Sequence, residues 1–329
     1  MMQKIYNDEV NEIVELVEKK MINENITIKR TIAHKVNGDE EQLTVQFHDS
    51  NIGPSLPLKY YHDKLYDGYT LEEIAEMMVK VIHNSQKFAP EVPELSQRTA
   101  KENLYCVVVN TEMNQELLKT VPHEKVEDLS VVPRFRVGDM GSVLVTHDLC
   151  RRFQMTPEEV LEYAWKNTNK EEIYINHVMN EVVKIMEDMG APQEYIEEFQ
   201  ETQMKAFPLY IVSNRQKIDG AVAMASKTLM DQAFSYVQQK HPDIESIFVI
   251  GSSRHEVLLI PDMNNWSVED LLNIHKEVQG AELSEVDKLT ENIYRYNGRT
   301  HKLSIADSCT LSKSQSETKD IVKTHSRSF

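Results

Sequence analysis

One pattern occurs three times along this chain of 329 residues and strongly limits the folds that it can adopt. In each case a Thr or Ser stands three positions before an acidic residue, at the start of an apolar, helix-like segment. The three starts are Thr70-Leu71-Glu72-Glu73, Thr156-Pro157-Glu158-Glu159 and Ser267-Val268-Glu269-Asp270. Such a hydroxyl accepts a bond from a backbone N–H of the first turn while the acidic side chain bonds back, which is a capping box. We therefore predict a helix beginning within about three residues of each cap.

Each predicted helix follows two short segments typical of a β-hairpin. The hairpin segments are residues 26–33 with 42–48, residues 129–137 with 142–147, and residues 247–250 with 257–261. In the first hairpin Asn37-Gly38 supplies the turn, because both residues tolerate positive φ. A two-stranded hairpin cannot bury its apolar face alone, so the following helix must cover it. We predict an α+β fold of repeated β-hairpin-plus-helix units, in which antiparallel sheets are each covered by helices on one face.

Further elements are predicted between these units. Helices are expected at residues 7–21, 112–120, 171–204 and 227–240, strands at 104–110, 209–214, 220–225 and 289–296, and a loop at 58–68. Within the acidic segment 171–204, the apolar residues predicted to face inward are Val178, Val182, Ile185, Met186 and Met189.

Composition changes along the chain indicate its division. Pro90 and Pro93 mark a break, and the chain is rich in Ser, Thr and Lys from His301 onward. We expect an N-terminal helix, hairpin and capped helix in residues 1–92, a middle α+β unit with acidic connecting helices in 93–205, a C-terminal α+β unit in 206–300, and a mobile polar tail in 301–329.

The third hairpin, residues 247–261, contains the densest group of potentially reactive side chains. Its two strands are apolar at successive positions, which predicts burial on both faces. Between them lie Ser252, Ser253, His255 and Glu256, which raise the hypothesis of a hydrolase. Side chains alternate between the faces of an extended strand, so adjacent His255 and Glu256 point apart and do not form a catalytic triad with Ser253. We therefore favour serines that bond backbone groups in the turn, with His255 and Glu256 at a sheet rim, and keep a Ser253/His255/Glu256 hydrolase as the alternative.

Other kinds of site find little support in the sequence. The twelve histidines include no His-x-His or His-x-x-x-His pair, and Cys106, Cys150 and Cys309 are too far apart for a thiolate zinc site, so we expect no metal. No Gly-x-Gly-x-x-Gly or Walker-type loop occurs, so we expect no nucleotide cofactor. Three tyrosines in the loop at 58–68 are a candidate interface with another protein, or they cover a helix end; they are Tyr60, Tyr61 and Tyr66.

The net charge of −17 bears on the partners of this chain. Lys and Arg are scattered, so the acidic surface disfavours binding to nucleic acid, and an acidic mimic of nucleic acid is a second alternative function. The N-terminus lacks the apolar segment of a signal peptide, and no apolar run is long enough to span a bilayer. We expect a cytoplasmic protein without membrane contact.

A family resemblance rests on motifs spread over most of the chain. These are Leu58-Lys59-Tyr60-Tyr61, Asp67 to Ile74, Glu116-Leu117-Leu118, Val121-Pro122-His123, Asn167-Thr168, Tyr210 to Asn214, Gly220-Ala221, Ser252-Ser253, His255-Glu256-Val257 and Ile293 to Tyr296. Together they resemble the bacterial domain of unknown function 5688, which is common in Firmicutes of the gut. The resemblance implies an uncharacterised cytoplasmic bacterial protein, with carriage by a mobile element as a further expectation. We predict a non-catalytic interaction or regulatory protein whose partner is another protein.

Overall fold

The computed structural model describes residues 2–49, 53–87, 94–138, 141–206, 208–251, 253–280 and 285–306. The chain forms two compact units, one of Met1–Pro93 with Val137–Met140 and the other of Glu94–Arg136 with Gly141–Phe329. Ser252, Cys309 and the predicted tail beyond residue 306 lie outside the described residues.

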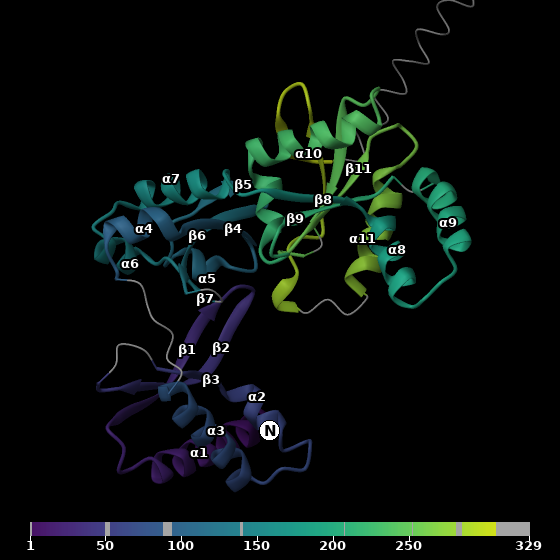
Figure 1. Ribbon diagram of the computed structural model, residues 1–329. Helices are drawn as coiled ribbons and strands as arrows, with labels where there is room; N and C mark the ends of the chain where they lie inside the picture. Colours follow the sequence, from purple (N-terminus) through teal and green to yellow (C-terminus); the bar gives the residue numbers. More distant parts are fainter. Residues whose placement is uncertain are drawn as a thin grey trace, which may run out of the picture. The chain divides into compact units, whose positions relative to one another are not determined.

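The first unit packs helices on one face of a three-stranded antiparallel sheet, coloured purple to blue in Figure 1. Its elements are α1 (Met2–Lys20), β1 (Ile26–Lys35), β2 (Gly38–Phe47), β3 (Ser55–Pro57), α2 (Leu58–Asp63) and α3 (Leu71–Lys87), with strand order β1-β2-β3. Leu43, Val45 and Phe47 alternate along β2 and point into the same core as Val10 and Ile13 of α1. Strand periodicity and helix periodicity thus bury one shared apolar layer.

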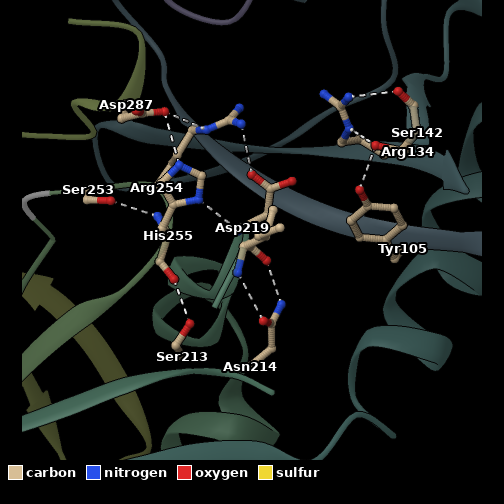
Figure 2. A network of polar contacts seen from close by, with 11 residues as sticks. Tyr105, Arg134, Ser142, Ser213, Asn214, Asp219, Ser253, Arg254, His255 and Asp287 are labelled. Atoms are coloured by element: carbon tan, nitrogen blue, oxygen red, sulfur yellow. Dashed lines mark hydrogen bonds and ion pairs between the residues drawn. The ribbon is translucent and has the colours of Figure 1, made fainter. Parts of the chain in front are cut away.

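The second unit begins with a four-stranded sheet. Its elements are α4 (Gln97–Asn103), β4 (Leu104–Asn110), α5 (Gln115–Leu118), β5 (Glu124–Val126), β6 (Leu129–Val137), β7 (Gly141–Leu144), α6 (His147–Phe153) and α7 (Pro157–Thr168). The order is β4-β6-β5, and β7 pairs with β6. Arg134 of β6 and Tyr105 of β4 both donate hydrogen bonds of 2.9 Å to the hydroxyl of Ser142 in β7 (Figure 2). These bonds hold β7 against the sheet.

A six-stranded antiparallel sheet completes the second unit. Its elements are β8 (Ile173–His177), α8 (Val178–Asp188), α9 (Gln193–Ala206), β9 (Tyr210–Asn214), the 3-10 helix η1 (Gly220–Ala225), α10 (Lys227–Lys240), β10 (Ser246–Ile250), β11 (Val257–Pro261), α11 (Val268–Gly280), the 3-10 helix η2 (Glu285–Asp287), β12 (Ile293–Asn297) and β13 (Lys302–Ile305). The strand order is β13-β12-β10-β11-β9-β8.

The predicted hairpin at 247–261 forms the centre of this sheet. β10 and β11 pair antiparallel with Ile247 opposite Pro261, and every residue of both strands is buried. Alternate residues enter two cores: Val257 and Leu259 pack with α10, whereas Leu258 and Ile260 pack with α11. The prediction of burial on both faces is therefore confirmed. This sheet carries helices on both faces rather than on one, which corrects that detail of the predicted architecture.

The α+β class and the repeated unit are confirmed. Helices α3, α7 and α11 begin at Leu71, Pro157 and Val268, each directly after its predicted cap. At α7 the Thr156 hydroxyl accepts from the Glu159 N–H at 3.2 Å while the Glu159 carboxylate accepts from the Thr156 N–H at 2.8 Å. Both contacts of the capping box are formed.

Four predicted segments are wrong in the structure. The tyrosine-rich loop contains helix α2, which buries Leu58, Tyr61 and His62 at helical spacing. The expected helix from 171 begins with strand β8, because its Ile173-Tyr174-Ile175 alternation finds a partner strand in β9. Residues 220–225 form η1 rather than a strand, and residues 302–305 form β13 rather than a mobile tail.

The predicted inward stripe of the acidic helix is wrong at two of its five positions. Ile185 is 59% exposed and Met189 is 81% exposed, and the buried residue of α8 is Val183. Val178 does pack against the core that contains Phe248 and Leu258, and Val182 and Met186 are half-buried.

The predicted domain boundaries stay a prediction. Strand β8, in the expected middle unit, pairs with β9 of the expected C-terminal unit over Ile173–His177. Among the described residues, no helix is both long and apolar enough to cross a membrane.

Candidate functional site

The predicted cluster lies where three segments of the second unit meet: the chain entering β11, the connection from β9 to η1, and η2. Backbone bonds join them, since Arg254 N–H donates to Asp287 O at 2.9 Å and Gly220 N–H donates to His255 O at 3.0 Å. Ser253 also forms an antiparallel β-bridge with Lys288. Main-chain hydrogen bonds therefore fix the positions of these three segments relative to one another.

Gly220 permits this close approach of backbone segments. A Cβ atom at this position would lie 2.3 Å from Ser213 Oγ and 2.6 Å from Asn214 N, so no larger residue fits without displacement. The Ser213 hydroxyl itself donates to His255 O at 2.7 Å. The preceding residue, Asp219, has a left-handed φ of 58°, which turns the chain into η1.

Both ring nitrogens of His255 are hydrogen-bonded (Figure 2). The backbone N–H of Asp219 donates to Nδ1 at 3.2 Å, so Nδ1 is the unprotonated nitrogen of a neutral ring. Nε2 then carries the hydrogen and donates to Asp287 Oδ1 at 3.0 Å. The imidazole thereby links two segments, the connection from β9 to η1, which precedes it in the sequence, and η2, which follows it.

The Ser253 hydroxyl has a different partner from the one that catalysis requires. It accepts a hydrogen bond from the backbone N–H of His255 at 2.9 Å, a local contact typical of serine in turns. A nucleophile must instead donate to an imidazole nitrogen. Both nitrogens of His255 are occupied by Asp219 and Asp287. The structure brings Ser253 and His255 together, but in the arrangement of a turn and not of a triad.

Arg254 supplies the charge balance of the cluster. Its guanidinium lies 3.4 Å from Asp219 Oδ1 through Nη2 and 3.2 Å from Asp287 Oδ1 through Nε (Figure 2). Asp219 is only 6% exposed, so its carboxylate requires a compensating charge. We name the group of Asp219, Arg254, His255 and Asp287 the histidine latch.

Glu256 lies outside the histidine latch. Burial raises the pKa of its carboxyl, and the charge of Glu181 acts in the same direction, while Lys217 and His255 oppose the increase. Glu181 has the opposite behaviour, because hydrogen bonds from Tyr174 and Asn176 lower its pKa to about 2. Burial thus disfavours the ionised form of Glu256, which is the form that the acid of a triad requires.

A cavity of about 10 Å³ adjoins the latch and is lined in part by Ser213, Asn214 and Gly220. This volume is close to that needed for one water molecule. No substrate larger than water can occupy it.

The three tyrosines predicted as an interface differ in their burial within the first unit. Tyr61 is 8% exposed and belongs to the core, whereas Tyr60 is 59% exposed and Tyr66 is 82% exposed. The Tyr60 ring already lies beneath the ammonium of Lys64, at 5.3 Å. Of these three tyrosines, Tyr60 and Tyr66 are the exposed ones.

Tyr66 also borders an open cavity of about 390 Å³, whose other lining residues are Ile5, Tyr6, Glu9, Lys59, His62 and Asp63. Helices α1 and α2 supply these side chains. His62 Nε2 donates to Glu9 Oε2 at 2.8 Å, and the ring of Tyr6 stands edge-on to the imidazole at 4.6 Å. The sequence predicts Tyr66 as a candidate contact residue, but it does not predict that Glu9 lies beside His62, because the two are 53 residues apart.

The described residues contain no group of three or more His, Cys, Asp or Glu side chains placed to hold a metal ion. Cys106 is buried, and this burial raises the pKa of its thiol far above the ordinary value, so it is not a reactive thiolate.

No curated protein and no solved structure matches the chain. A family profile matches residues 6–298, in agreement with the motifs between Leu58 and Tyr296. The chain belongs to the family of unknown function DUF5688.

Proposed function

We propose that this protein is a non-catalytic interaction protein, and that it contacts its partner through Tyr60, Tyr66 and the adjoining cavity of the first unit. The observation that carries the proposal is the occupation of both His255 nitrogens by Asp219 and Asp287, which leaves the most reactive-looking cluster without a base. We further infer a bacterial cytoplasmic setting, with a mobile element as a candidate carrier.

The exposed tyrosines support an interaction role. Large aromatic side chains combine apolar area with a polar end and are enriched at interface cores. Tyr66 is 82% exposed and stands beside a cavity of about 390 Å³, within the size range of ligand sites. An aromatic ring at the rim of a concave surface is a typical anchor for a partner's side chain.

The interaction is tested by affinity capture from cells that encode the protein, followed by measured binding of the purified pair. We expect one stoichiometric partner for the wild type, and loss of that partner for the double variant Tyr60→Ser/Tyr66→Ser. The matched control is Tyr195→Ser, because Tyr195 is 68% exposed and belongs to the other unit. Equal capture by the double variant would contradict the proposed surface.

The catalytic alternative is tested in parallel. Wild type and Ser253→Ala are assayed against ester, peptide and phosphoester substrates. We expect no turnover by either protein, because the Ser253 hydroxyl accepts from a backbone N–H and has no base. Turnover by the wild type that Ser253→Ala lacks would refute a non-catalytic role.

A further inference from the structure

We propose that the cavity between α1 and α2 binds the guanidinium group of an arginine in a basic segment of the partner. This inference rests on the proposed function and specifies its partner chemistry. Its basis is a pair of carboxylates that have no Lys or Arg partner in the described part of the chain. They lie beside the exposed ring of Tyr66 and the half-buried ring of Tyr6, in a cavity of about 390 Å³.

The carboxylates are those of Glu9 and Asp63, which flank one buried imidazole. His62 has a side chain only 5% exposed; its Nε2 is 2.8 Å from Glu9 Oε2, and its Nδ1 is 3.8 Å from Asp63 Oδ1. The ring therefore fixes Glu9 at one side of the cavity, while Asp63 remains 51% exposed at the other. Glu9 is hydrogen-bonded to the ring, whereas Asp63 lies near Nδ1 without a hydrogen bond to it. A guanidinium carries several N–H donors in one plane and can bond both carboxylates at once, which suits it better than a single ammonium.

Glu9 and Asp63 differ from neighbouring carboxylates, which are paired with a Lys or Arg side chain. Glu41 of the same unit is paired with Arg30, and Asp67 is paired with Lys64 at 2.8 Å. Among the described residues, neither Glu9 nor Asp63 has a Lys or Arg nitrogen within the 4.0 Å of an ion pair. A bound cation would supply the missing partner.

The aromatic rings of Tyr66 and Tyr6 provide further contacts for a guanidinium group. Tyr66 and Tyr6 both line the cavity and both stand edge-on to His62, at 6.0 and 4.6 Å between ring centroids. A guanidinium stacked on an exposed tyrosine face gains a cation–π interaction. Lys59 is the opposing charge at the rim, but it stands against two carboxylates. The net charge of −17 further favours approach of a basic segment.

The experiment is isothermal titration of the full chain with the peptide acetyl-Gly-Arg-Gly-amide, at low and at physiological salt. The matched probe is the same peptide with citrulline, which keeps the shape of arginine and removes its charge. We expect the arginine peptide to bind at least tenfold more tightly than the citrulline peptide. We also expect Glu9→Gln and Asp63→Asn each to weaken binding about tenfold, Tyr66→Leu to weaken it severalfold, and Lys59→Met to strengthen it.

The control variant is Glu15→Gln, which removes an equal charge from an exposed position of α1 outside the cavity. Urea unfolding followed by far-ultraviolet circular dichroism verifies that each variant remains folded, because the first unit contains no tryptophan. Equal affinity for the two peptides would overturn the proposal, and so would equal weakening by Glu15→Gln and Glu9→Gln. Binding of inorganic phosphate that requires Lys59, without binding of arginine, would identify an anion site instead and would also overturn it. The proposed interaction function fails separately, if the captured partner is indifferent to Tyr60→Ser/Tyr66→Ser.

Discussion

Replacing His255 by alanine removes the central contact of the histidine latch. The substitution leaves the backbone N–H of Asp219 without its acceptor at 3.2 Å and deletes the Nε2 bond to Asp287 at 3.0 Å. An unpaired buried donor costs about 1–3 kcal/mol, and a lost hydrogen bond costs about 1 kcal/mol net. We therefore expect the free energy of unfolding of the second unit to fall by about 2–4 kcal/mol.

Two near-isosteric variants separate these contributions. His255→Asn places its side-chain oxygen where Nδ1 stands and keeps the bond from Asp219 N–H, whereas His255→Gln keeps a donor near the Nε2 position for Asp287. Since Asp219 is the more buried partner, we expect the loss of stability to increase in the order Asn, Gln, Ala. Ser253→Ala should cost less than His255→Ala, because it removes one acceptor from a single backbone N–H.

The assay is urea unfolding at neutral pH, followed by tryptophan fluorescence. Both tryptophans, Trp165 and Trp266, lie in the second unit, so the signal reports on the unit that contains the latch. With a slope of about 3 kcal/mol per molar urea, the alanine variant should shift the midpoint by about 1 M. A midpoint unchanged by His255→Ala, or an equal shift for Asn and Ala, would refute the assignment of a structural role to both ring nitrogens.

Four further outcomes follow from individual contacts. Hydrogen bonds from Tyr174 and Asn176 lower the pKa of Glu181 to about 2. Its carboxylate should therefore contribute at most about 3 kcal/mol to the free energy of unfolding above pH 4.5, and this contribution should be lost as pH falls towards 2. Glu181→Gln should flatten that part of the profile of stability against pH. Burial raises the pKa of Glu256, so Glu256→Gln should raise the melting temperature at pH 7. This gain should disappear as pH falls through the raised pKa, and a lower melting temperature of the variant at pH 7 would contradict the reasoning. Gly298→Ala places a Cβ 2.2 Å from the ring of Phe234 and should cost about 1–3 kcal/mol in urea unfolding, whereas an unchanged midpoint would mean that the ring yields freely. The net charge of −17 predicts no measurable binding to duplex DNA at physiological salt, and tight, salt-sensitive binding in a gel-shift assay would reveal an overlooked basic face.

The parts of the fold that depend on neighbouring residues could be predicted from the sequence. The cap at Thr156 bonds to a residue three positions away, and β10 pairs with β11 across a short connection. The apolar character of successive residues in Val257–Pro261 also predicts burial on both faces, which the two cores confirm. In each case the sequence itself contains both partners of the interaction.

Contacts between distant segments could not be predicted in this way. Asp219 and Asp287 lie 36 and 32 residues from His255, on either side of it, and neither belongs to a motif. A longer example is Asp128, whose carboxylate accepts from Thr290 Oγ1 at 2.8 Å across 162 residues. A single sequence gives the residue types of such networks but not which of them meet. That is decided by how the two sheets of the second unit and their connecting segments pack together.

The same distinction explains why the most reactive-looking motif is not the best candidate for function. Ser253, His255 and Glu256 attract notice because they are close together in the sequence. In the structure the chain bends at Arg254 and His255, and the Ser253 hydroxyl accepts from the His255 N–H instead of donating to its ring. His255 has used its hydrogen-bonding capacity on Asp219 and Asp287. In the cavity of the first unit the acidic groups come from two helices, and they remain open to a ligand. A group that already has all its partners stabilises a fold, whereas a group held in place with capacity remaining can bind, and Glu9 beside His62 belongs to the second kind.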